Sequence, residues 1–245
     1  RRGWVRIRLT ILYDNTSLRD DTQADWGFSC AIELPGTRVL FDTGADPQIL
    51  LANMGALGFG PGDFEFVVIS HDHWDHTGGL DAVLEANANA VVVVPSGVSD
   101  ELGNMVRSHG VTLKDVTVAA QLAPGLLSTG VVHGDIAEQA AAVRVEDGMV
   151  VLTGCAHPGV ARMVAAARTL LADDVELLLG GFHLKSFDGP GVAAVIGDLR
   201  RLAVARVAPC HCTGAEAIDL FGEAWGESFT RIGVGWSETW SDASD

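Results

Sequence analysis

Three histidines and two aspartates gather within six consecutive positions of this chain, directly after an apolar stretch at residues 64–70. They are His71, Asp72, His73, Asp75 and His76. The apolar stretch is typical of a buried strand, and a loop at the end of such a strand brings reactive side chains together on a rigid scaffold. Imidazole and carboxylate are both good ligands for zinc-type ions. The pattern therefore predicts a site for two adjacent metal ions and not a solvated turn.

The elements that must position this loop alternate between strand-like and helix-like segments. Residues 28–34 and 38–41 are joined by a Pro35-Gly36 turn, which predicts a β-hairpin. Further strands are predicted at 64–70, 90–94, 140–145, 149–153, 175–179 and 204–208, and helices at 46–57, 78–88, 160–171 and 191–202. Hairpins mixed with crossover helices favour mixed sheets covered by helices over a purely parallel doubly wound sheet.

The length of 245 residues favours a single α/β domain over two. Residues 1–10 begin with basic side chains, and from Val5 to Thr10 apolar and polar side chains alternate, which predicts an edge or surface strand rather than a signal peptide. From about residue 238 the chain is polar, and we expect this tail to fray.

Charge and composition narrow the classes of partner. The formal net charge of −16 repels nucleic-acid phosphates and anionic membrane surfaces, so neither partner is expected. No apolar run reaches the roughly 18 residues of a membrane span. The four cysteines are expected to be reduced thiols in a cytoplasmic protein. The expected partner is a small-molecule substrate; the oligomeric state stays open, with a homodimer as one option.

Two motifs carry a resemblance to a known family. The segment His-Asp-His-Trp-Asp-His at 71–76 is similar to the HxHxDH signature of the metallo-β-lactamase superfamily. Upstream, Leu-Phe-Asp-Thr-Gly at 40–44 resembles that superfamily's first motif, a strand that ends in an Asp-Thr-Gly turn. The resemblance covers residues 11–236. It implies an α/β (α+β) fold, a four-layered αββα sandwich of two mixed β-sheets with the site at one edge between them.

A narrower resemblance rests on five further motifs. They are Asp-Asn-Thr at 14–16, Trp-Gly-Phe-Ser at 26–29, Gly-Cys-Ala-His-Pro-Gly at 154–159, Gly-Gly-Phe-His-Leu at 180–184 and Pro-Cys-His-Cys-Thr-Gly at 209–214. They are similar to the subgroup of 7,8-dihydropterin-6-methyl-4-(β-D-ribofuranosyl)-aminobenzene-5′-phosphate synthase-like proteins. The resemblance implies a pterin or a phosphate ester as the substrate class.

The resemblance also implies a division of the ligands between two ions. His157 and His211 each follow a predicted strand, as the first cluster does. The predicted sets are His71, His73 and His157 for the first ion, and Asp75, His76 and His211 for the second. We expect one or two divalent ions, with Zn²⁺ favoured and Mn²⁺ or Fe²⁺ also accepted by such ligands.

The chain departs from the superfamily pattern in two places. The histidine turn expected before the next ligand strand is replaced by Ser-Thr-Gly at 128–130 and Glu-Gln at 138–139, with His133 nearby but outside such a turn. The usual metal-bridging aspartate is also missing, and Cys155 occupies roughly its place. Either the Cys155 thiolate binds metal, or His157 substitutes and the bridge is lost, so the second ion's occupancy stays open.

Other residues are expected to support the site. His183 follows the strand at 175–179 and is a candidate for substrate contact, proton donation or metal binding. Glu138 and Trp74 are candidate substrate contacts, since an indole face suits an aromatic or heterocyclic substrate. Asp42 is expected to orient a ligand histidine from behind, with direct metal binding as the alternative. Residues outside these roles are His109, expected at the surface, and Cys210 and Cys212, which are not assigned as ligands.

The implied activity is that of a metal-dependent hydrolase, or a related lyase or cyclase. A zinc-type ion lowers the pKa of bound water from about 15.7 toward about 7, and the resulting hydroxide attacks a carbonyl or phosphoryl centre. Asp75 would bind metal or orient the nucleophile, and His183 would protonate the leaving group. Two alternatives stay open: a ligand-binding or sensor protein with a degenerate metal site, and a di-iron redox protein, whose HxExDH motif has Glu at the position of His73.

Overall fold

The computed structural model describes residues 6–171 and 173–241. Their contacts divide the chain into two compact units. The first contains the described residues of Arg1–Thr117 and Gly233–Asp242, and the second those of Val118–Ile232. In this described part of the chain, every helix is too short or too polar to cross a membrane.

The first unit contains a mixed sheet with the strand order β13-β1-β2-β3-β4-β5-β6. Strands β13, β1, β2 and β3 pair antiparallel, whereas β3, β4, β5 and β6 run parallel. The bounds are Ser237–Ser241 for β13, Arg6–Tyr13 for β1, Ser29–Leu34 for β2, Thr37–Phe41 for β3, Phe66–Val68 for β4, Val91–Pro95 for β5 and Thr112–Val116 for β6.

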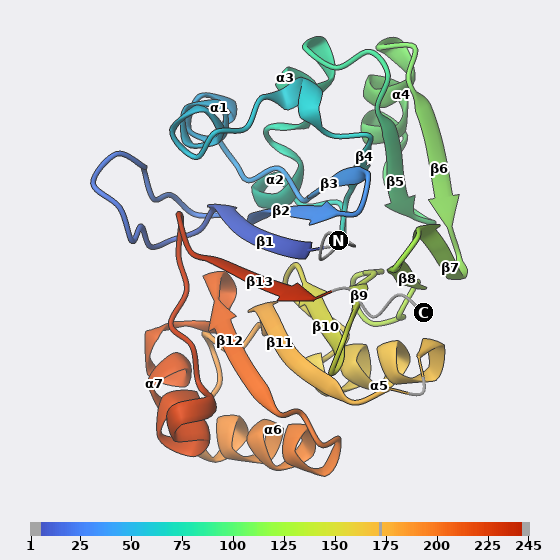
Figure 1. Cartoon of the computed structure of the whole chain (residues 1–245). Helices are drawn as coiled ribbons and strands as arrows, with labels where there is room; N and C mark the ends of the chain where they lie inside the picture. The colour runs from blue at the N-terminus through green and yellow to red at the C-terminus, as the bar shows by residue number, and fades with distance from the viewer. Residues whose placement is uncertain (1–5, 172, 242–245) are drawn as a thin grey trace, which may run out of the picture. The chain divides into compact units, whose positions relative to one another are not determined.

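Helices of the first unit lie along one side of this sheet (Figure 1). The bounds are Pro47–Ala56 for α1, Trp74–Thr77 for α2, Leu80–Glu85 for α3 and Asp100–Ser108 for α4, with a short 3-10 turn, η1, at Pro61–Asp63. Helix α1 starts at Asp46, whose carboxylate accepts from the backbone N–H groups of Gln48 and Ile49. Leu50 of α1 and Val83 of α3 are fully buried in one apolar core with strand residues such as Val92.

The second unit contains a mixed sheet with the order β12-β11-β10-β9-β8-β7. Strands β10, β11 and β12 run parallel, and β10, β9, β8 and β7 pair antiparallel. The bounds are Val118–Ala123 for β7, Leu126–Gly130 for β8, Ala141–Val145 for β9, Gly148–Thr153 for β10, Val175–Gly181 for β11 and Arg206–Cys210 for β12.

Three helices lie along one side of the second sheet (Figure 1). They are α5 at Val160–Leu170, α6 at Gly189–Arg201 and α7 at Ala215–Trp225, with 3-10 turns η2 at His211–Thr213 and η3 at Gly226–Ser228. Met163 of α5, Leu199 of α6 and Phe221 of α7 are buried in one core with β-strand residues such as Leu178. The carboxyl ends of the three parallel strands all lie at the same edge of this sheet.

Most of the predicted elements are confirmed, with boundaries shifted by a few residues. The sequence predicted no helix or strand between residues 95 and 139. It also did not predict the helix α7 or the strand β13. One expectation was wrong in part and another was wrong. The strand β1, predicted at an edge or at the surface, is not an edge strand, because β13 pairs along its outer side; Arg6 and Arg8 are exposed, as in a surface strand. For the same reason Glu238–Ser241 do not fray but belong to a strand; residues 1–5 and 242–245 of these two predictions lie outside the described residues.

Candidate metal centre

In the first unit the histidine cluster follows β4 and continues into the short helix α2. His73 is the residue that precedes the first turn of α2, and His71 lies two residues earlier with no exposed surface. Nε2 of His71 lies 3.1 Å from Nδ1 of His73. Two nitrogens bound to one tetrahedral zinc at 2.0–2.1 Å stand about 3.3 Å apart. The spacing of this pair therefore matches two ligands of a single ion.

The buried carboxylate of Asp42 orients two of the histidines, His76 by a direct hydrogen bond and His71 through Ser70. Asp42 follows β3 and accepts a hydrogen bond from Nδ1 of His76 at 2.8 Å. It also accepts from the backbone N–H and the hydroxyl of Ser70, each at 2.7 Å, and that hydroxyl lies 2.9 Å from Nδ1 of His71. With Nδ1 engaged in this way, Nε2 is the nitrogen that each ring presents to an ion. The hydrogen bonds thus give Asp42 the orienting position predicted for it, and metal binding by the two histidine rings stays a prediction.

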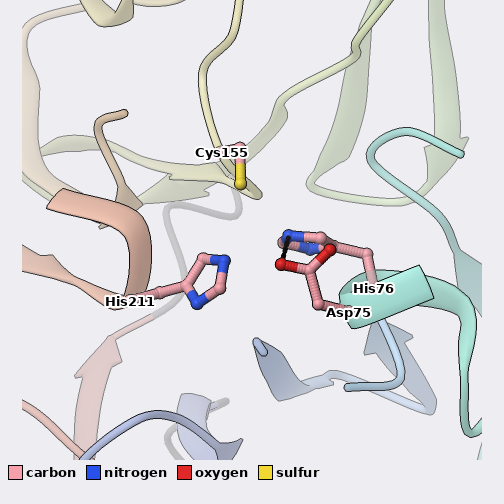
Figure 2. A group of neighbouring side chains, drawn as sticks. All are labelled: Asp75, His76, Cys155 and His211. Atoms are coloured by element: carbon pink, nitrogen blue, oxygen red, sulfur yellow. Dashed lines mark ion pairs between the residues drawn. The ribbon is translucent and has the colours of Figure 1, made fainter. Parts of the chain in front are cut away.

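Asp75 and His76 project from α2 and form an ion pair, drawn as a dashed line in Figure 2. One oxygen of Asp75 lies 3.8 Å from Nε2 of His76 and accepts a hydrogen bond from the Trp26 indole N–H at 2.8 Å. Trp26 stands in the loop between β1 and β2, so it orients Asp75 from a distant part of the sequence. Trp74, by contrast, is 65% exposed, which leaves its ring face accessible to solvent.

In the second unit Glu138 holds the loop after β10. Its carboxylate accepts hydrogen bonds from three consecutive backbone N–H groups, those of Cys155, Ala156 and His157, at 2.7–2.9 Å. Glu138 has no exposed surface, so the structure gives it a different role from the predicted substrate contact. Ala156 adopts the left-handed conformation with φ of 59°, which a residue other than glycine seldom does without a compensating interaction.

The remaining predicted residues stand on the loops after β10, β11 and β12. The rings of His157 and His183 lie 4.2 Å apart, measured between centroids. His211 is buried in η2 and is labelled in Figure 2 together with the thiol of Cys155. Both His183 and His211 have positive φ, 55° and 47°. Strained backbone is stored preferentially at functional sites, and here it occurs at three loops of one sheet edge.

The side chains present fit a zinc-type ion. The first unit offers three imidazoles and a carboxylate, two of the rings already oriented by hydrogen bonds at Nδ1. The second unit offers imidazoles and thiols, and all four cysteines are buried thiols outside any disulfide. Both donor kinds are suitable for zinc.

A sequence model of the metallo-β-lactamase superfamily matches residues 27–166. The chain belongs to this superfamily. A protein of Methanocaldococcus jannaschii is 26% identical to this chain, over 92% of this chain and 94% of that protein. That protein is named 7,8-dihydropterin-6-methyl-4-(β-D-ribofuranosyl)-aminobenzene-5′-phosphate synthase. The predicted family and the resemblance to the subgroup are confirmed.

Solved structures of other proteins have the same fold. The crystal structure of Tm1679, described as a metal-dependent hydrolase of the β-lactamase superfamily, matches with a TM-score of 0.80 at 25% identity. The match covers 96% of this chain and 100% of Tm1679. Zinc-bound PqqB from Methylobacterium extorquens shares the fold at 13% identity and a TM-score of 0.61, over 94% of this chain and 99% of PqqB. The predicted α/β (α+β) metallo-β-lactamase fold class is therefore confirmed.

Sequence reasoning missed three residues that the structure places beside predicted site residues. Ser70 joins Asp42 to His71, Trp26 binds Asp75, and Cys212 lies beside Cys155. Trp26 and Cys212 both stand in the motifs that resemble the subgroup, which was the available signal. His109, predicted to lie at the surface, is half-buried, and its Nε2 lies 2.7 Å from a carboxylate oxygen of Asp81.

Proposed function

We propose that this protein is a metal-dependent hydrolase that acts on a small-molecule phosphate ester, with a pterin-like heterocycle as the preferred group. The observation that carries the proposal is the buried Asp42–His76 hydrogen bond behind the histidine cluster, a pairing that orients metal-ligating imidazoles and raises their basicity. The superfamily membership and the match to Tm1679, described as a metal-dependent hydrolase, support the reaction class.

The proposed ligands of the two ions are the residues that the sequence predicts. His71, His73 and His157 would hold the first ion, and Asp75, His76 and His211 the second. The spacing of the His71 and His73 nitrogens supports one shared ion, and the carboxylate of Asp75 beside Nε2 of His76 supports a second. Imidazole with carboxylate favours zinc, and the same donors accept manganese or iron.

A bound divalent ion would activate a water molecule and stabilise negative charge that develops on the substrate. The protein's own residues prepare that chemistry. Asp42 keeps the proton of His76 on Nδ1, and Trp26 holds the Asp75 carboxylate in place by its indole N–H. His183, exposed and beside His157, is the proposed proton donor to the leaving group.

The substrate class rests on the resemblance to the dihydropterin phosphate synthase, 26% identical over nearly the whole of both chains. A phosphate ester supplies the phosphorus atom that a metal-activated water molecule would attack. The exposed indole of Trp74, next to His73 in the sequence, offers a flat apolar face on which a heterocycle can stack. A related lyase or cyclase reaction on the same substrate class would use the same groups.

The test combines metal analysis with turnover. Purified protein is expected to contain one or two divalent ions and to hydrolyse bis(p-nitrophenyl) phosphate or a dihydropterin phosphate, and to lose this activity after chelation. His71→Ala and His211→Ala should each lower metal content and activity. His109→Ala is the matched control, because His109 is bonded to Asp81 and lies outside both ligand sets. Full activity after exhaustive chelation overturns the proposal, and stoichiometric metal without turnover of any ester favours a sensor.

A further inference from the structure

A second donor cluster lies wholly within the second unit, at the carboxyl ends of its three parallel strands. Cys155 stands on the loop after β10, His183 on the loop after β11 and Cys212 in η2 after β12. Their sulfur and nitrogen donor atoms all lie within 4.8 Å of one another. Adjacent parallel strands deliver their following loops to one edge, so residues 57 positions apart, Cys155 and Cys212, come together.

Glycine makes this approach possible. A Cβ atom on Gly181, the last residue of β11, would stand 2.6 Å from the sulfur of Cys212 and 2.4 Å from the carbonyl oxygen of Gly154. The backbone of β11 can therefore pass directly beneath the two cysteine loops only because position 181 has no side chain. The Cys212 thiol donates to the carbonyl oxygen of Cys155 at 3.6 Å, which fixes its direction.

An exposed imidazole on one side and a strained backbone set this cluster apart from ordinary core thiols. Cys155 and Cys212 are 3% and 5% exposed, whereas His183 is exposed. An ion would thus reach the two buried sulfurs from the imidazole side. His183 itself has φ of 55°, and the residue after Cys155, Ala156, has φ of 59°. Left-handed residues that are not glycine persist where the surrounding structure imposes them, and they concentrate at ligand sites.

We propose that Cys155, His183 and Cys212 form a separate site for a thiophilic divalent ion of the zinc class. Zinc binds sulfur at about 2.3 Å and nitrogen at 2.0–2.1 Å, so tetrahedral donors stand about 3.5–3.8 Å apart. The observed cluster, within 4.8 Å, needs only a small closure. Two thiolates select zinc-class ions over magnesium or manganese, and each thiol releases its proton when the ion binds. The site uses none of the six proposed catalytic ligands, and Cys155, the alternative ligand that the sequence offers for the second ion, is assigned to this separate cluster.

Occupancy of this site has a consequence for turnover, and only that consequence rests on the proposed hydrolysis. An ion on His183 removes the imidazole that we propose as proton donor. Excess zinc is then expected to inhibit hydrolysis, and Cys212→Ser to relieve the inhibition without removing the catalytic ions.

Binding is tested by titrating the metal-free protein with Co²⁺ under anaerobic conditions in a phosphine reductant. The readout is the near-ultraviolet thiolate-to-cobalt charge-transfer absorption. The titration is repeated in a His71→Ala, His76→Ala double variant, which lacks histidines of both proposed catalytic sets but leaves the second unit unchanged. The band is expected in both proteins. Cys212→Ser should remove about half of its intensity, because one of two thiolate ligands is lost.

The controls for this cobalt titration are separate from those of the hydrolysis test. Cys30→Ala, in β2 of the first unit, should leave the band unchanged. His183→Asn changes an exposed side chain and suits the left-handed backbone, so it tests the site without unfolding the protein and should weaken Co²⁺ binding. A band that is absent from the double variant, or unchanged by Cys212→Ser, overturns the proposal. A disulfide between Cys155 and Cys212 that resists the reductant does the same. None of these results bears on whether His71 is needed for hydrolysis.

Discussion

Asp42 accepts a hydrogen bond from Nδ1 of His76 at 2.8 Å, and neither side chain has exposed surface. The two residues are 34 positions apart, one after β3 and the other in α2. Asp42 has φ of 56°, a conformation that aspartate and asparagine tolerate better than most residues. A short polar side chain at a left-handed turn therefore reaches the ring of a histidine that the sequence places in a different motif.

Asp42→Asn is expected to lower metal affinity by about 10–100-fold while the protein stays folded. Asparagine fits the left-handed backbone, but it has one acceptor oxygen where aspartate serves both Ser70 and His76. Affinity is measured by competition with a chromophoric chelator. The matched control is Asp72→Asn, whose carboxylate accepts from the backbone of Ser99 instead. Equal affinity in Asp42→Asn and the wild type would contradict an orienting role.

Glu138→Gln is expected to destabilise the fold by about 1–3 kcal/mol, because an amide N–H₂ would face buried backbone N–H donors. Three such donors, from Cys155, Ala156 and His157, depend on this carboxylate. The free energy of unfolding in urea measures the effect. Glu146→Gln, at an exposed turn, should change it by no more than about 0.5 kcal/mol. Similar values for the two variants would show that the loop does not need Glu138.

Gly181→Ala is expected to cost about 1–3 kcal/mol of unfolding free energy, since the added methyl group has no space. Its nearest neighbours would be the Gly154 carbonyl oxygen and the Cys212 sulfur, at 2.4 and 2.6 Å. Gly197→Ala, in α6 of the same unit, is the control and should gain about 0.5–1 kcal/mol from helix propensity. If both alanine variants are more stable than the wild type, the close approach at Gly181 is wrong.

Cys30 is expected to resist thiol reagents in the native protein. Its sulfur is fully buried in β2, and burial raises the pKa of the thiol, so the reactive thiolate is scarce even at mildly alkaline pH. Alkylation followed by mass spectrometry of the Cys30 peptide measures this. Labelling should appear only after unfolding in urea. Native labelling at the rate of the unfolded chain would be the contrary result.

Elements whose interactions are local could be predicted well from the sequence. The hairpin of β2 and β3 follows from the turn at Pro35 and Gly36, and α1 follows from the capping carboxylate of Asp46. Strand β13 could not be predicted, because Ser237–Ser241 is polar and is held by pairing with β1, more than 200 positions earlier. The same pairing turned the expected edge strand into an internal one.

By itself, the sequence determined the donor chemistry, the superfamily and the elements with strong local signals, because residue type, short-range spacing and turn composition act within a few positions. Only the tertiary structure decided which polar groups meet. The Trp26 indole donates a hydrogen bond to Asp75, Glu138 accepts hydrogen bonds from three backbone N–H groups of a later loop, and the Cys212 thiol contacts the backbone of Cys155. These contacts arise when strands distant in the sequence pair in one sheet and the shared apolar core is buried, a condition that no short segment contains.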